Sequence, residues 1–126
     1  LPDKFPKLRF GFIEAGASWI PYSMSQLATQ QRSHKLHERA LTLDLKKDLF
    51  RDNRLFVVID PVDDIEYLLT FGTEDNLMIG TDYGHSDQSA NVSALGEVGR
   101  WEEKGRISKR VATKILEENP RVFYGL

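Results

Sequence analysis

The chain has 126 residues, 40% of them hydrophobic, and a formal net charge of −2 at pH 7. This size and balance are typical of one globular domain, and the near-neutral charge gives no reason to expect nucleic acid or a membrane surface as a partner. There is no cysteine and no apolar run of about 18 residues, which excludes disulfides, thiolate chemistry and a transmembrane helix; because no signal peptide is visible either, we expect a cytoplasmic protein.

Three short apolar runs predict the strands of a sheet. They are "LRFGFI" (residues 8–13), "LFVVI" (residues 55–59) and "NLMIGT" (residues 76–81). Continuous apolar runs of this length are typical of strands that are buried on both faces. We therefore expect residues 8–13, 55–59 and 76–79 to form three adjacent parallel strands.

Stretches of helical character lie between and after these runs. The first extends from residue 22 to about residue 40, with Pro21 in its first turn. The second, "DDIEYLLTFG" (residues 63–72), has acidic residues at its start and a glycine just past its end. Near the C-terminus, Ser108 is the expected N-cap of a helix that Pro120 ends.

The resulting order, β-α-β-α-β-α-α, predicts an α/β fold with a parallel sheet. Three βα units are too few to close a barrel, because a complete (β/α)₈ barrel needs about 250 residues. At this point two architectures remain open: a small open sheet, or part of a larger barrel.

An acidic residue follows each predicted strand: Glu14 after the first, Asp60 after the second and Asp82 after the third, with His85 three residues beyond Asp82. In parallel α/β folds, ligands bind at the carboxyl ends of the strands. A carboxylate there can bind a metal ion, act as a general base, or do both. Alternatively, such acids cap helices or lie in solvated loops, an interpretation that the nearby histidine weakens for Asp82.

Four segments, "FPKLRFGFIEAGASWIPY", "LFVVID", "NLMIGTDYGHSD" and "KILEENPRVFYGL", follow one another in an order and spacing that resemble the amidohydrolase-related family of metal-dependent hydrolases and decarboxylases. The resemblance extends from Phe5 to Leu126. It implies that residues 1–126 form a single, incomplete domain: three parallel βα units, the sixth to the eighth, from the C-terminal part of a (β/α)₈ TIM-type barrel. The missing half of the barrel, or another copy of the chain in a homo-oligomer, would then complete the protein.

The resemblance also implies roles for individual residues. Asp82 corresponds to the aspartate that binds a divalent metal ion, usually zinc, and moves a proton to or from the metal-bound water. Glu14 occupies the position of a catalytic histidine of the decarboxylases. His85 corresponds to a histidine that often follows the aspartate, although the family usually has proline where Gly84 stands. Asp87 is expected to support the site or to cap a helix.

The metal-binding histidines of the family's first and fifth strands have no counterpart here, so the other metal ligands are expected outside this chain. The resemblance implies a metal-dependent hydrolase or decarboxylase-like lyase that acts on a small carboxylated or carbonyl compound. The alternative is a non-catalytic α/β fragment or interaction module that has lost the metal site.

Overall fold

The computed structural model describes residues 4–34, 49–86 and 90–126. Its sheet is parallel and has the strand order β1-β2-β3. The strands are β1 (Phe10–Phe12), β2 (Leu55–Ile59) and β3 (Leu77–Ile79). The prediction of three adjacent parallel strands is therefore confirmed.

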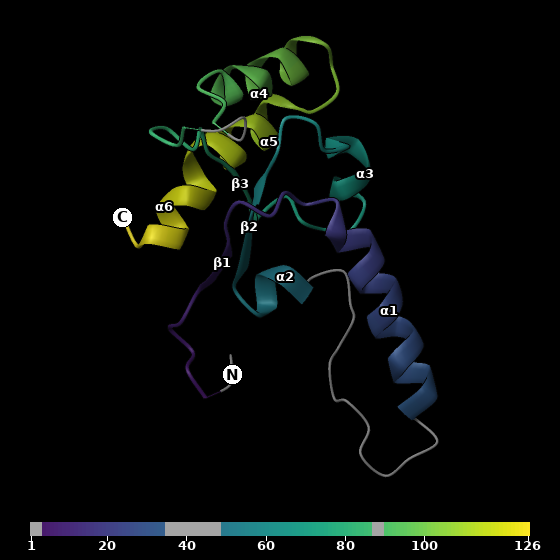
Figure 1. Ribbon diagram of the computed structural model, residues 1–126. Helices are drawn as coiled ribbons and strands as arrows, with labels where there is room; N and C mark the ends of the chain where they lie inside the picture. Colours follow the sequence, from purple (N-terminus) through teal and green to yellow (C-terminus); the bar gives the residue numbers. More distant parts are fainter. Residues whose placement is uncertain (1–3, 35–48, 87–89) are drawn as a thin grey trace.

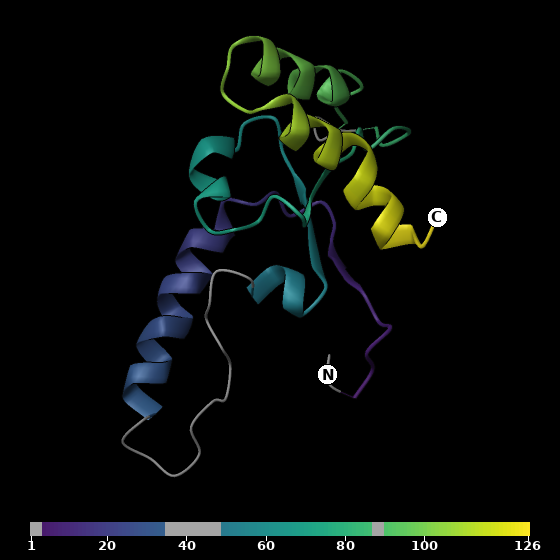
Figure 2. The same cartoon turned by 180° about the vertical axis from the view of Figure 1, so that it is seen from behind.

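Helices precede, connect and follow the second and third strands. In chain order they are α1 (Trp19–His34), α2 (Leu49–Asp52), α3 (Ile65–Leu69), α4 (Ala94–Glu103), α5 (Lys109–Thr113), the π-helical turn η1 (Lys114–Glu118) and α6 (Asn119–Tyr124). Both views of the chain place α1 and α3 on one side of the strands and α6 on the other (Figures 1 and 2). The first helix begins at Trp19, three residues before the expected start, and its expected end near residue 40 lies outside the described residues.

The side chains of β2 and β3 alternate between the two faces of the sheet, as the pleat requires. Val57, Ile59, Leu77 and Ile79 belong to the main hydrophobic core, together with residues of α1, α3, α4, α5 and η1. On the opposite face, the Phe56 ring lies 5.4 Å from the ring of Phe123 in α6. Burial of apolar area on both faces accounts for the continuous apolar runs of these two strands.

The expectation that the first strand is buried on both faces is wrong. β1 spans only Phe10–Phe12. The relative exposure of Phe12 is 40% and that of Ile13 is 49%. β1 pairs with β2 along one side, with Phe12 opposite Val57, and forms an edge of the described sheet. An edge strand has a neighbour on one side alone, which leaves part of its surface in contact with solvent.

Pro120 does not end the C-terminal helix, contrary to the sequence-based expectation. The chain stays helical to Tyr124, and Pro120 is the second residue of α6. Proline cannot donate to the carbonyl four residues earlier, and its ring clashes with that carbonyl in a regular α-helix. The preceding turn is π-helical: the Asn119 amide donates to the Lys114 carbonyl, five residues back. This wider turn accommodates the proline without breaking the helix.

Across residues 4–34, 49–86 and 90–126, none of the helices has the length and apolar character needed to cross a membrane.

Candidate functional site

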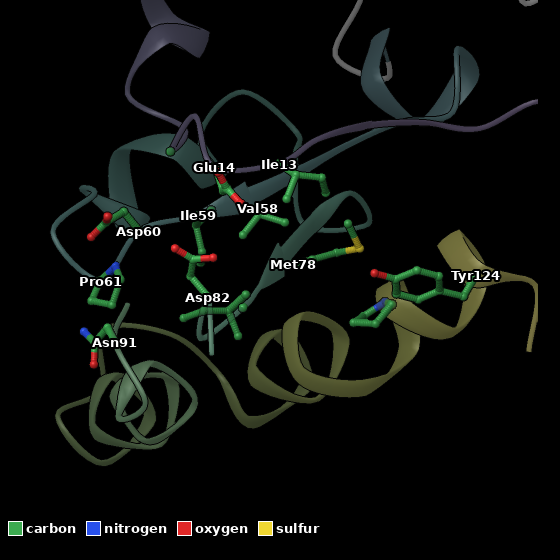
Figure 3. A pocket seen from close by; sticks show the side chains of 14 residues that line it. Ile13, Glu14, Val58, Ile59, Asp60, Pro61, Met78, Asp82, Asn91 and Tyr124 are labelled. Atoms are coloured by element: carbon green, nitrogen blue, oxygen red, sulfur yellow. The ribbon is translucent and has the colours of Figure 1, made fainter. Parts of the chain in front are cut away.

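A cavity of about 250 Å³ opens at the carboxyl ends of the strands. Its lining includes the acid that follows each strand, Glu14, Asp60 and Asp82, and a tyrosine of α6, Tyr124 (Figure 3). The apolar side chains of Val58 and Met78, among others, form the sheet wall of the cavity. The parallel sheet thus brings side chains from all three strand ends to one hollow, because such ends meet at the same edge.

Asp82 and His85 form a hydrogen-bonded pair at this rim. The Nδ1 atom of His85 lies 2.8 Å from Oδ2 of Asp82. The Asp82 side chain is 24% exposed and that of His85 is 49% exposed, and only Asp82 lines the cavity. An imidazole that is protonated at Nδ1 donates a hydrogen bond from this N–H group to the carboxylate. The bond fixes the orientation of both side chains.

A tight turn after β3 produces this pair. The His85 amide donates to the Asp82 carbonyl at 3.2 Å, so the turn spans residues 82–85. Gly84 has a φ of +95°, which proline cannot adopt because its ring holds φ near −65°. Glycine at this position therefore allows a turn that brings His85 back onto Asp82, whereas the proline usual in the resembling family would prevent it.

Glu14 and Asp82 share an unusual backbone conformation. Their φ angles are +59° and +49°, in the left-handed region that residues other than glycine rarely occupy. Aspartate tolerates this region better than glutamate does, and each such residue costs about 1–3 kcal/mol unless its surroundings hold it there. Backbone strain of this kind is concentrated at functional sites, and here it affects two of the acids that border the cavity.

Asp63 connects the loops that carry Glu14 and Asp60. Its buried carboxylate accepts hydrogen bonds from the backbone amides of Ala17 and Asp60, both at 2.8 Å, and from the Ser18 hydroxyl. It thereby joins the loop after β1 to the loop after β2. In the sequence, Asp63 is only one of several acids at the start of a helix, and nothing local distinguishes it from its neighbours.

Asp60 borders the cavity but is engaged in its own turn. One of its carboxylate oxygens accepts a hydrogen bond from the Val62 amide at 3.0 Å. In Figure 3 its carboxylate is turned away from those of Glu14 and Asp82. Asp60 is therefore the least suited of the three acids to act on a molecule in the cavity.

Two further cavity residues were not identified from the sequence. The Asn91 amide donates to the Thr81 carbonyl at 2.9 Å, and its side chain accepts from the Ser93 amide at 3.0 Å, so Asn91 joins the start of α4 to the residue that follows β3 and Gly80. Tyr124 reaches the cavity because the helix continues past Pro120, and Figure 3 shows its hydroxyl directed toward Met78. An "NxS" spacing before a helix could have indicated Asn91; no sequence signal indicated Tyr124.

The zinc ion implied by the resemblance does not fit the described residues on their own. Within them, no group of three or more His, Cys, Asp or Glu side chains is close enough together to hold a metal ion. Catalytic zinc takes about three protein ligands, and Asp82 with its partner His85 falls short of that number. Asp87 lies outside the described residues.

Comparison with known proteins does not assign the chain to a family. No protein-family model, no curated protein and no solved structure gives a significant match.

Proposed function

We propose that the chain forms the C-terminal part of a (β/α)₈-type hydrolase or lyase related to the amidohydrolases, and that its substrate is a small carboxylated or carbonyl compound. The observation that carries this proposal is the Asp82–His85 pair, with its 2.8 Å hydrogen bond, at the edge of the cavity. The sequence resemblance and the parallel sheet support it. So does the strained backbone at Glu14 and Asp82, because such strain is concentrated at active sites.

In the proposed reaction, Asp82 is the group that moves the proton. During hydrolysis its carboxylate accepts a proton from the attacking water and delivers it to the departing group; during decarboxylation Asp82 first takes up a proton from solvent and then delivers it to the carbon that loses CO₂. His85 acts as a positioning residue, since it contacts Asp82 and lies outside the cavity lining. Its hydrogen bond holds the carboxylate in one orientation, which reduces the reorganisation needed when the proton moves.

The other lining residues would bind and orient the substrate. Val58 and Met78 offer an apolar wall to its body. Glu14, from the loop after β1, can accept hydrogen bonds from a polar group or pair with a cationic one. A metal ion, if bound through ligands from outside the described residues, would polarise a substrate oxygen; no step described here depends on it.

The test is to measure turnover of a panel of small carboxylic acids, esters and lactones by the protein. Release of CO₂ or of acid reports the reaction. Asp82→Asn is nearly isosteric and should lower turnover by about 10²–10⁴-fold, the usual contribution of a general acid–base group. His85→Gln should lower kcat with little change in KM, because a positioning residue acts on the proton transfer. Asp52→Asn is the matched control: this exposed aspartate of α2 pairs with Arg51 and precedes the amino-terminal end of β2, whereas the cavity lies at its carboxyl end. Normal turnover in Asp82→Asn would refute the proposal.

The alternative is an interaction module without catalytic activity. Two observations favour it: the described residues supply no complete metal site, and the edge strand β1 leaves Phe12 and Ile13 exposed. This alternative predicts no turnover on any compound of the panel, together with stable association of the protein with a second polypeptide along β1.

A further inference from the structure

A second cavity lies at the amino-terminal end of the sheet and has a basic lining. Its volume is about 590 Å³, and four cationic side chains border it: Lys7, Arg9, Arg51 and Arg54. Two acids, Asp75 and Glu118, border it as well. This cavity has no lining residue in common with the one that contains Asp82, so the inference drawn from it does not depend on the proposed catalytic function.

Backbone carbonyls hold two of the guanidinium groups in place. Nη1 of Arg9 donates to the Val122 carbonyl at 2.7 Å, and Nε of Arg54 donates to the Leu8 carbonyl at 3.0 Å. A carbonyl oxygen orients a guanidinium group without neutralising its charge. Arg9 therefore presents a positive charge in a fixed position at the wall of the cavity.

The backbone of Arg54 is strained at the same place. Its φ is +54°, a backbone conformation that favours glycine or asparagine over arginine. The Arg54 carbonyl accepts from the Phe10 amide at 3.0 Å, so this residue joins the start of β1 to the start of β2. Its side chain is thereby anchored between two strands, which is the rigid support that a binding site requires.

One of the two acids is already paired. Asp75 bonds with the Lys114 ammonium group, which also contacts Glu74 at 2.7 Å. This pairing offsets the negative charge of Asp75, and Arg51 is in turn paired with Asp52. The remaining cations of the lining, Lys7, Arg9 and Arg54, still exceed its other acid, Glu118. Phe56 and Val122 add an apolar part to the lining.

We propose that this cavity binds a small anion of the phosphate class. A phosphate group carries up to two negative charges and several acceptor oxygens, so it can bond with more than one of the cations that line the cavity at once. A monocarboxylate would bond with fewer of these cationic side chains. The apolar patch formed by Phe56 and Val122 can contact the organic part of a phosphate ester.

The test is titration of the protein with inorganic phosphate, pyrophosphate and phenyl phosphate by calorimetry, with backbone amide shifts recorded in parallel by NMR. We expect saturable binding that weakens as the salt concentration rises, with the largest shifts at residues around Phe56, Asn76 and Val122. Tighter binding of phenyl phosphate than of inorganic phosphate would identify an organic phosphate as the natural ligand. Equal binding would identify free phosphate.

Lys7→Gln and Arg9→Gln should each weaken pyrophosphate binding by about tenfold or more, the usual effect of removing a charge-assisted contact. Arg121→Gln is the control, because Arg121 of α6 pairs with Glu117 of η1 and does not line the cavity. A thermal melt would detect whether Arg9→Gln loosens α6. In that case Lys7→Gln still tests the proposal, because the Lys7 side chain is exposed. The absence of saturable binding, an equal loss in Arg121→Gln, or shifts centred on Asp82 would overturn the proposal.

Discussion

The ring of Phe123 in α6 fills the space that a β-carbon on Gly11 of β1 would need. A β-carbon built on Gly11 would lie 2.5 Å from Cζ of Phe123 and 2.9 Å from Cε2. We expect Gly11→Ala to lower the free energy of unfolding by about 1–3 kcal/mol, because a close-packed interface accommodates an extra methyl group only by moving its neighbours. Chemical denaturation, followed by the change in midpoint at constant slope, measures this loss.

Gly99→Ala is the matched control for this prediction. Gly99 lies inside α4, and among the described residues no atom outside its own helix approaches a β-carbon there within 4 Å. Alanine should therefore stabilise the protein by about 0.5–1 kcal/mol through its higher helix propensity. A loss of stability in both variants, or in neither, would contradict the packing of Phe123 on Gly11.

Asp63 and Asp64 are adjacent aspartates with different expected sensitivities to the same substitution. Asp63→Asn removes the negative charge that accepts from the amides of Ala17 and Asp60, and it places an NH₂ group where the Ser18 hydroxyl now donates. We expect it to cost about 1–3 kcal/mol. Asp64 is the exposed N-cap of α3 and accepts from the Tyr67 amide at 3.2 Å. Asp64→Asn should have an effect within about 0.5 kcal/mol, since asparagine caps a helix as well as aspartate does. Thermal melts of the two variants make the comparison.

Asp63 also illustrates the limit of what the sequence predicts. Its hydrogen bond from the Ala17 amide joins residues 46 positions apart, and only the pairing of β1 with β2 brings them together. The bounds of β2 were predicted correctly because a continuous apolar run that is rich in β-branched residues is a strong local signal. Ser108 was likewise predicted as an N-cap and accepts from the Val111 amide. Local signals of this kind can be recognised in the sequence, whereas hydrogen-bond partners that are distant in the chain cannot.

The candidate site could be predicted in part from the sequence. Parallel strands end at one edge, so acids that follow them were expected to meet, and Glu14, Asp60 and Asp82 do border one cavity. The exposure of β1 and the presence of Tyr124 at the cavity were not predicted. The first depends on which strand lies at the edge, and the second on a helix that continues past a proline.

The ion pairs of Lys114 should give the stability a specific dependence on pH. The hydrogen bond from Lys114, assisted by its charge and that of Arg110, holds the pKa of Glu74 below its ordinary value of 4.5, although partial burial opposes this. A carboxyl whose pKa is lower in the folded state stabilises the fold fully above 4.5. We expect this contribution to be lost as the pH falls below 4.5 and through the folded pKa. Urea denaturation at pH 7, 4.5 and 3 measures it.

Lys114 contributes at the opposite end of the pH range. Burial lowers its pKa, but the hydrogen bonds that its ammonium group donates to Asp75 and Glu74 outweigh this and raise the pKa above the ordinary value of 10.5. Its contribution is complete below 10.5 and is lost as the pH rises through the folded pKa. Glu74→Gln should flatten the acid limb of the stability profile, whereas Glu66→Gln, which removes the exposed pair with Arg106, should change it little. Equal flattening in both variants would argue against the pairing.

Zinc content offers a direct check on the metal that the resemblance implies. The described residues lack a cluster of three potential ligands, so we expect the purified 126-residue protein to retain less than about 0.1 zinc per chain after dialysis. A chelator should leave its melting temperature unchanged. Stoichiometric zinc that is lost in Asp82→Asn but kept in Asp52→Asn would contradict this prediction and would make Asp82 a metal ligand.

The π-helical turn before Pro120 makes the length of the C-terminal segment matter more than its composition. A turn closed over five residues holds one residue more than a turn closed over four. Deletion of one exposed residue, such as Glu117, would restore ordinary spacing and rotate everything beyond it by about 100°. Phe123 would then leave Gly11, and Tyr124 would leave the cavity. Single-residue insertions and deletions between residues 114 and 118 are therefore expected to be far less tolerated than substitutions at the same positions.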